Sequence, residues 1–126
     1  KNNIFFFLEG QTLNHIFKNN CLDPSDHDDD VGVYYKDRKK IIGLDDTFNK
    51  NGFEIIRIND SMISVCRMYR YIDICLFKNY LLTIGYGNKK FSKKYYSKFS
   101  TLNFENIEFK IPNNAEEFLK TRYGIK

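Results

Sequence analysis

Asp28 and Asp30 lie two positions apart at the start of a stretch that alternates in polarity as far as Tyr35. Residues two apart on a β-strand project from the same face, so these carboxylates repel each other unless a cation neutralises them. Carboxylate oxygens at that spacing suit Mg²⁺ or Mn²⁺. Asp73, in the apolar run "YIDICLF", is a third carboxylate whose burial without a partner is unfavourable. Together these side chains predict a divalent-metal site that binds a diphosphate and activates a hydroxyl.

Simpler explanations exist for each of these aspartates. An acidic run before a strand is often a solvated turn, which needs no ligand. Asp73 could face solvent from an edge strand, or it could pair with Arg67 or Arg70. The acidic run here continues into the strand itself, which favours the metal site over the solvated turn.

A calcium-binding loop is a further alternative for the acidic run. Asp26, Asp28 and Asp30 occupy the first, third and fifth places of an EF-hand pattern. Val31 stands where that loop needs glycine, and Asp37 stands where it needs a bidentate glutamate. The flanking segments also have the pattern of strands and not of paired helices, so we favour the Mg²⁺ or Mn²⁺ site.

The elements that must position these residues follow from hydrophobic periodicity and turn residues. We expect a strand over 4–8, a short amphipathic helix within 11–20, a strand over 28–35 and a basic helix over 36–52. The β-rich runs 53–60, 62–70, 71–77 and 81–87 predict a meander of mostly antiparallel strands. An irregular segment over 89–100, a last strand over 102–111 and a helix that stops at Gly124 complete the chain. This order predicts an α+β domain with a mixed β-sheet flanked by helices.

Length and composition limit the domain organisation and the classes of function. With 126 residues, of which 42% are hydrophobic, we expect one domain over 1–126, or a piece of a longer chain. A net charge of +4 with scattered lysines does not demand nucleic acid and is compatible with a phosphate-bearing ligand. The opening apolar run "IFFFL" is too short to span a membrane. The odd number of cysteines without a CxxC pair favours reduced thiols, and hence a cytoplasmic location unless a longer chain is membrane-anchored.

The stretch "LEGQTLNHIFKNNCLDPSDHDDDVGVYY" resembles the opening motif of the LicD/fukutin family. Gly10 and Gln11 fall at the glycine turn of that motif, Thr12 matches its helix start and Lys18 falls at its arginine. Pro24, Asp26, Asp28 and Asp30 match its acidic segment. "YIDICLF" and "FENIEFKIPNNAEEFLKTRYG" are similar to later motifs of the family, and they occur in the same order. Gln11, Asn14, His15 and Asp29 depart from the family pattern.

This resemblance implies a minimal nucleotidyltransferase-like fold and a divalent-metal-dependent phosphotransferase. The donor would be CDP-linked, such as CDP-choline or a CDP-alditol, and the acceptor would be a glycan. Asp28, Asp30 and Asp73 would be the catalytic and metal-binding residues. The phosphates of the donor would be contacted by Gly10, Gln11, Thr12 and Lys18. The first three would do so through the backbone and the N-terminus of the helix that begins there.

Two other functions stay open on the same fold. The altered glycine motif is compatible with a non-catalytic module that binds a metal or a protein partner in the acidic cleft. A nucleotidyltransferase that takes a nucleoside triphosphate and releases pyrophosphate would use the same carboxylates.

Overall fold

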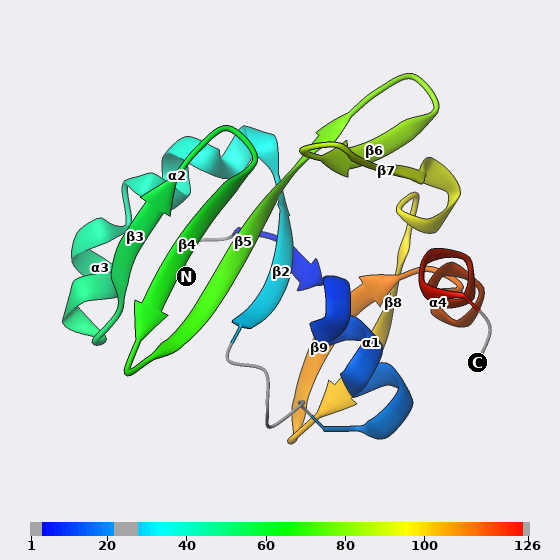
Figure 1. Cartoon of the computed structure of the whole chain (residues 1–126), viewed down its shortest axis with the longest axis horizontal. Helices are drawn as coiled ribbons and strands as arrows, with labels where there is room; N and C mark the ends of the chain where they lie inside the picture. Colours follow the sequence, from blue (N-terminus) through cyan, green and yellow to red (C-terminus); the bar gives the residue numbers. More distant parts are fainter. Residues whose placement is uncertain (1–3, 22–27, 125–126) are drawn as a thin grey trace.

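The computed structural model describes residues 4–21 and 28–124 and shows a twisted mixed sheet flanked by helices (Figure 1). The strands are β1 (Phe6–Leu8), β2 (Asp28–Tyr34), β3 (Glu54–Ile58), β4 (Met62–Arg67), β5 (Arg70–Asn79), β6 (Thr83–Tyr86), β7 (Lys89–Ser92), β8 (Phe99–Phe104) and β9 (Ile107–Pro112). The helices are α1 (Gly10–Asn19), α2 (Arg38–Ile42), α3 (Asp45–Lys50) and α4 (Ala115–Tyr123), with single 3-10 turns η1 (Tyr35–Asp37) and η2 (Lys93–Tyr95).

The main sheet has the strand order β1-β2-β5-β4-β3. Strands β2 and β5 run parallel to each other, while β1 pairs antiparallel with β2 and β3, β4 and β5 form an antiparallel meander. The far end of β5 continues into β6 and β7, and β8 and β9 form a separate hairpin beside β1 (Figure 1). The α+β class, the mixed sheet and the antiparallel meander predicted from the sequence are therefore confirmed.

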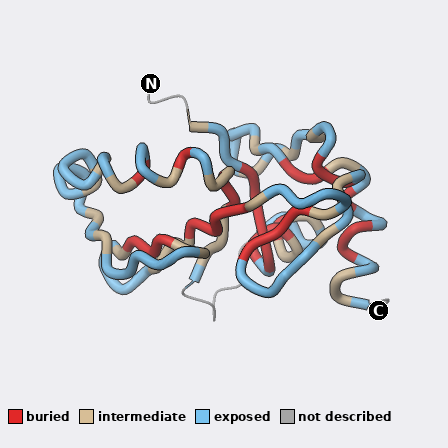
Figure 2. Tube along the Cα trace, turned by 90° about the horizontal axis from the view of Figure 1, so that it is seen from above, coloured by how far each residue is buried: buried red, intermediate tan, exposed pale blue. Residues whose placement is uncertain are grey.

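The two faces of the sheet are separated by the alternation of side chains along β2 and β5. Val33 and Leu76 point to the face covered by α2 and α3, where they pack with Ile41 in a small apolar cluster. Phe77 and Cys75 point to the other face and join a larger cluster with α1, α4 and the two hairpins. Buried residues accordingly follow the strands, while the connecting loops are exposed (Figure 2).

The prediction of one continuous helix over 36–52 is wrong. The segment forms η1, α2 and α3, and it breaks at Gly43 and Leu44. Glycine is a poor helix former, and the acidic residues Asp45 and Asp46 in the first turn of α3 favour a new helix start there. Ile41 is buried as expected, whereas the other apolar side chains of the segment are only partly covered.

The C-terminal third contains more strand than its sequence predicts. Residues 89–92 form β7 within the segment expected to be irregular, and the single strand expected over 102–111 is the hairpin of β8 and β9. Glu105 and Asn106 make its tight turn with φ values of 50° and 65°, a conformation that usually signals glycine in the sequence. The helix that stops at Gly124 is confirmed.

The three cysteines of the chain all lie among the described residues. All three cysteines are free: Cys21 is exposed, Cys66 is half-buried and Cys75 is buried. Burial raises the pKa of the Cys75 thiol, so this side chain stays protonated at neutral pH.

Over residues 4–21 and 28–124, no helix has the length and apolarity to cross a bilayer.

Gly32 leaves room for two aromatic rings over the middle of β2. A Cβ atom at this position would lie 2.2 Å from the ring of Phe7 and 2.8 Å from that of Phe77. We expect Gly32→Ala to lower the free energy of unfolding by about 1–3 kcal/mol through overpacking. Gly43→Ala, where the nearest atom is 3.4 Å away and the backbone is helical, serves as the matched control. Urea denaturation of both variants tests this, and equal stabilities would contradict it.

Candidate active site

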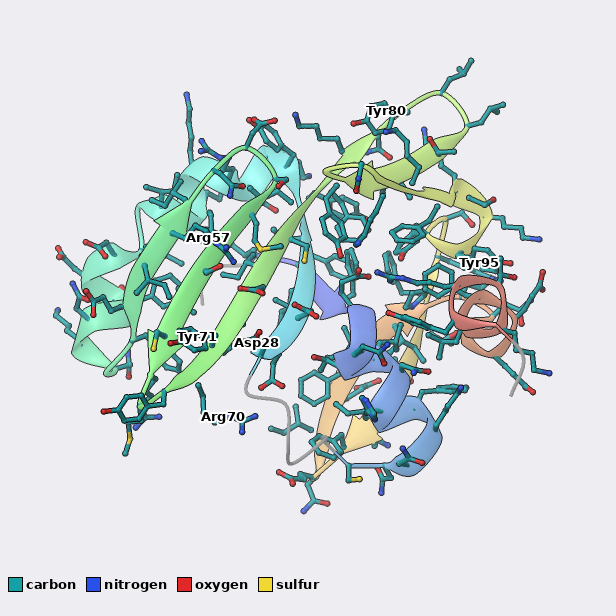
Figure 3. All side chains as sticks on the ribbon, in the orientation of Figure 1. Asp28, Arg57, Arg70, Tyr71, Tyr80 and Tyr95 are labelled. Atoms are coloured by element: carbon teal, nitrogen blue, oxygen red, sulfur yellow. The ribbon has the colours of Figure 1, made fainter. Side chains whose placement is uncertain are left out.

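The parallel register of β2 and β5 brings the predicted carboxylates together. Asp30 lies directly opposite Asp73, and Asp28 lies opposite Tyr71. Paired residues of adjacent strands project from the same face, so Asp28, Asp30 and Asp73 share one face of the sheet. This face is opposite to the one covered by α2 and α3, and it is open over β3, β4 and β5 (Figure 3).

Asp30 is held against the start of α1 by two hydrogen bonds and one close contact. Its backbone N–H donates to Thr12 Oγ1 at 2.7 Å, and its carbonyl accepts from the N–H of Glu9 at 3.3 Å. Gly10 has a φ of 61°, and a Cβ atom there would lie 2.8 Å from Asp30 Oδ2. Only glycine therefore lets the first turn of the helix approach this carboxylate without displacing it.

Asp73 is oriented from the other side of β5. Its Oδ1 accepts a hydrogen bond from Ser64 Oγ at 2.7 Å and lies 3.5 Å from Arg57 Nη2. Arg57 also donates to Ser64 Oγ, at 3.0 Å from Nη2 and 3.2 Å from Nε. The possible ion pairs of Asp73 with Arg67 or Arg70 are not what the structure shows, because the arginine beside Asp73 comes from β3.

Not every described aspartate of the acidic run belongs to this face. Asp29 points to the opposite face and lies 3.4 Å from Arg70 Nη2. Pro24 and Asp26, which complete the acidic motif and the EF-hand comparison, lie outside the described residues.

The residue types and their placement fit a divalent cation, although their present orientation is not that of a closed cage. Over residues 4–21 and 28–124, no three His, Cys, Asp or Glu side chains are grouped as a metal-binding set. The hydrogen bond from Ser64 accounts for part of this, because it directs one oxygen of Asp73 toward β4. Asp28 and Asp30 offer hard oxygen ligands on one strand, next to a helix start that only glycine permits.

The phosphate-contact residues predicted from the sequence do not all lie at the carboxylates. Gly10 and Gln11 line an open hollow of about 480 Å³ together with Asp30. Thr12 is buried, and its hydroxyl binds the backbone of Asp30. Lys18 is in the last turn of α1, about 12 Å along the helix from Gly10, and lines a different hollow beside α4.

The other walls of this hollow come from the β6–β7 hairpin, which the sequence did not single out, and from the closing segment of the chain. We call it the Asp30 hollow: besides Gly10, Gln11 and Asp30, it is lined by Tyr86, Lys89, Lys90 and Phe91 of the β6–β7 hairpin and by Arg122 and Tyr123 of α4. The paired lysines of "NKK" were the available signal, but local sequence does not reveal which strand faces them. A larger hollow of about 750 Å³ lies elsewhere and is lined by none of the carboxylates.

A buried ion pair holds the walls of the Asp30 hollow together. Glu9 is 0% exposed, and it accepts from Arg122 Nη1 at 3.0 Å and from Nη2 at 2.8 Å. The hydroxyl of Tyr86 donates to the same carboxylate at 2.7 Å. The guanidinium of Arg122 also lies 4.5 Å from the centroid of the Phe91 ring. α1, the β6–β7 hairpin and α4 therefore meet at this single carboxylate.

The charge state of this pair follows from its surroundings. Burial, followed by the charge of Glu9, raises the pKa of Tyr86 well above its usual range, so the phenol remains a donor. Burial alone would lower the pKa of Arg122, but the hydrogen bonds and charge of Glu9 outweigh it and raise that pKa. Arg122 is thus a fixed cation whose donors are directed at Glu9.

Removal of Arg122 tests whether this pair supports the fold. Arg122→Met leaves a buried carboxylate without its cation, so we expect a loss of about 3–5 kcal/mol in the free energy of unfolding. Glu9→Gln combined with Arg122→Met should recover part of that loss. Lys120→Met, which breaks an exposed pair with Glu116 on the same helix, should cost less than about 1 kcal/mol. Urea denaturation measures all variants; a similar loss for the Arg122 and Lys120 variants would contradict this role.

Gly10→Ala tests the approach of α1 to Asp30. The added methyl meets the mobile end of the Asp30 side chain, so we expect the carboxylate to move at little further cost in stability. Gly87→Ala is the control, because its φ of 57° imposes similar backbone strain and its nearest neighbour is 3.9 Å away. The ¹³C resonance of the Asp30 carboxylate should shift in the first variant only. An unchanged resonance in Gly10→Ala would show that the glycine is not needed there.

The comparisons with known proteins address the fold. No family model matches this sequence, and no curated protein matches it either. Among solved structures, the chain is similar to the lincosamide antibiotic adenylyltransferase LnuA, in a lincomycin-bound crystal structure. The TM-score is 0.58 at 18% sequence identity, and the match covers 92% of this chain and 74% of that chain. The chain therefore has a nucleotidyltransferase-like fold, as the resemblance implied.

Proposed function

We propose that the chain is a transferase that moves a phosphorus-bearing group from a nucleotide donor onto a hydroxyl of an acceptor. The observation that carries this proposal is the register of β2 and β5, which sets Asp30 beside Asp73 with Asp28 on the same open face. The nucleotidyltransferase-like fold supports it, although fold alone does not define a reaction.

The three carboxylates are the proposed reaction centre. Asp28 and Asp30 would bind Mg²⁺ or Mn²⁺, and Asp73 completes the set on the neighbouring strand. A divalent cation bound there would neutralise phosphate oxygens and stabilise the charge that develops during transfer.

The Asp30 hollow is the proposed donor site. Lys89 and Lys90 are exposed on its hairpin wall, and their charges suit the phosphates of a nucleotide. On the opposite wall, the first turn of α1 presents backbone N–H groups before the first helical hydrogen bond, from Leu13 to Glu9. Phosphates between these walls would lie next to Asp30.

The transfer itself is an in-line displacement at phosphorus. The acceptor hydroxyl oxygen forms a bond to phosphorus as the bond to the leaving phosphate oxygen breaks, and the hydroxyl proton passes to a carboxylate. Asp73 is the candidate for that proton, because it is paired with Ser64 of β4, and the face is open over β3 and β4 (Figure 3).

Two donor classes are compatible with this centre. The similarity to LnuA, named as an adenylyltransferase, favours transfer of a nucleotide from a triphosphate, with pyrophosphate as the product. The sequence resemblance to the LicD/fukutin family favours transfer from CDP-choline or a CDP-alditol to a glycan, with CMP as the product. A specific observation supports the second class: Arg122 and Tyr123, from the closing motif, line the same hollow as Gly10 from the opening motif.

A donor screen with product analysis tests the proposal. Thermal shift with Mn²⁺ and a panel of nucleoside triphosphates, CDP-choline, CDP-ribitol and CDP-glycerol identifies the donor through stabilisation of the folded state. Pyrophosphate release assigns nucleotidyl transfer, whereas CMP release assigns transfer of the CDP-linked group. Metal binding without turnover of any donor would instead identify the non-catalytic binding module.

Substitution of single carboxylates tests the reaction centre. We expect Asp28→Asn and Asp73→Asn to lower turnover by about 100-fold or more with the fold retained, because each removes a charge at the reacting phosphorus. Asp29→Asn is the matched control, since that side chain pairs with Arg70 on the opposite face. Steady-state kinetics with the identified donor, together with thermal unfolding, measures the effect. Full activity in Asp73→Asn would rule this centre out.

A further inference from the structure

A chain of side chains crosses the open face of the sheet and ends at Asp73. Arg57 on β3 is opposite Ser64 on β4, and Ser64 is opposite Asp73 on β5. Arg57 donates twice to Ser64 Oγ, and the Ser64 hydroxyl donates a 2.7 Å hydrogen bond to Asp73 Oδ1. In Figure 3, Arg57 extends over the sheet from β3 toward this position, on the same open face as the labelled Asp28 and Tyr71.

Burial shows which member of this chain sets the geometry. Ser64 is 1% exposed, so its hydroxyl is shielded from solvent and hydrogen-bonded between the two neighbours. The side chain of Arg57 is 55% exposed and that of Asp73 is 17% exposed. An ion pair this open contributes little to stability, so Ser64 orients Asp73 and Arg57 supplies mainly positive charge.

This arrangement treats Asp73 differently from Asp28 and Asp30. Asp73 lies between β2 and β4, and its Oδ1 is directed toward β4 by Ser64, away from the strand that carries the other two carboxylates. A guanidinium 3.5 Å from that oxygen also opposes a divalent cation at the same position. Over the described residues, accordingly, no three acidic, histidine or cysteine side chains form one metal-binding group.

We propose that Ser64 and Arg57 are positioning residues that divide the carboxylates into two roles, an inference that rests on the proposed function. Asp28 and Asp30 bind the cation, while Asp73 is kept for the acceptor and receives its hydroxyl proton on Oδ2. Ser64 and Arg57 hold Oδ1, so the second oxygen is the one left for the acceptor. The acceptor would then lie over β4 and β5, across the carboxylates from the donor in the Asp30 hollow.

Mn²⁺ titration calorimetry on the full chain, without nucleotide, tests this division independently of turnover. We expect Asp28→Asn and Asp30→Asn to lose Mn²⁺ binding, and Asp73→Asn to weaken it by only about 5-fold, because Asp73 contributes its nearby charge but no bond to the cation. Arg57→Gln should tighten Mn²⁺ binding by about 5-fold, because it removes a nearby positive charge and releases Asp73 toward the cation. Arg57→Lys, which keeps the charge, should not.

Arg70→Gln is the matched control for charge. It removes an arginine from an ion pair of 3.4 Å, comparable to the 3.5 Å pair of Arg57, but its partner Asp29 is on the opposite face. Equal tightening in the Arg57 and Arg70 variants would reduce the effect to net charge and overturn the proposal. Ser64→Ala adds a kinetic readout: turnover number should fall with the Michaelis constant for the donor unchanged, and an equal rise in that constant would contradict a positioning role.

The outcomes also separate this inference from the proposed function. Loss of Mn²⁺ affinity in Asp73→Asn as large as in Asp28→Asn would overturn the division of roles and leave the transferase proposal standing. Mn²⁺ binding with the expected pattern but without turnover of any donor would overturn the transferase and support the division of the metal site alone. Absence of Mn²⁺ binding by the unsubstituted protein would overturn both. Thermal unfolding of each variant confirms that the fold is retained.

Discussion

The contact on which the rest of this structure depends is the buried pair of Glu9 and Arg122, which joins residues 113 positions apart. Glu9 ends the turn from β1 into α1 and has no exposed surface, so its charge is tolerable only because a guanidinium and a phenol donate to it. Glu9 directly precedes Gly10, whose backbone lies against Asp30. The position of one carboxylate of the open face is thus set by a charge pair whose other half is near the end of the chain.

The same pair helps to explain why part of one face of the main sheet is left uncovered. α4 and the β6–β7 hairpin are held over one end of the sheet by Arg122 and Tyr86, while α2 and α3 cover the opposite face. The face over β3, β4 and β5 is left uncovered (Figure 3). Asp73 of β5 and Arg57 of β3 lie on this face, 3.5 Å apart. Asp73 accepts a hydrogen bond from Ser64 on one side, and part of its side chain reaches solvent on the other.

The sequence predicted those parts of this arrangement that follow from the alternation of side chains along a β-strand. The alternation of 28–35 assigned Asp28 and Asp30 to one face, and an aspartate within "YIDICLF" indicated a special position at Asp73. Registers between distant strands have no local signal, so neither the Glu9–Arg122 pair nor the Arg57–Ser64–Asp73 chain could be predicted. Lys18 illustrates the converse, because a motif position alone does not say that a helix carries that residue away from the carboxylates.

Arg122 links the opening and the closing segments of the chain in space. The opening and closing segments that resemble one family are far apart in sequence, yet Gly10, Gln11, Arg122 and Tyr123 line a single hollow. A buried carboxylate and its cation must be retained together, because loss of either leaves an uncompensated charge in the core. The buried carboxylate in the turn before Gly10 is therefore stabilised by the arginine of α4, and the two segments are coupled through this pair.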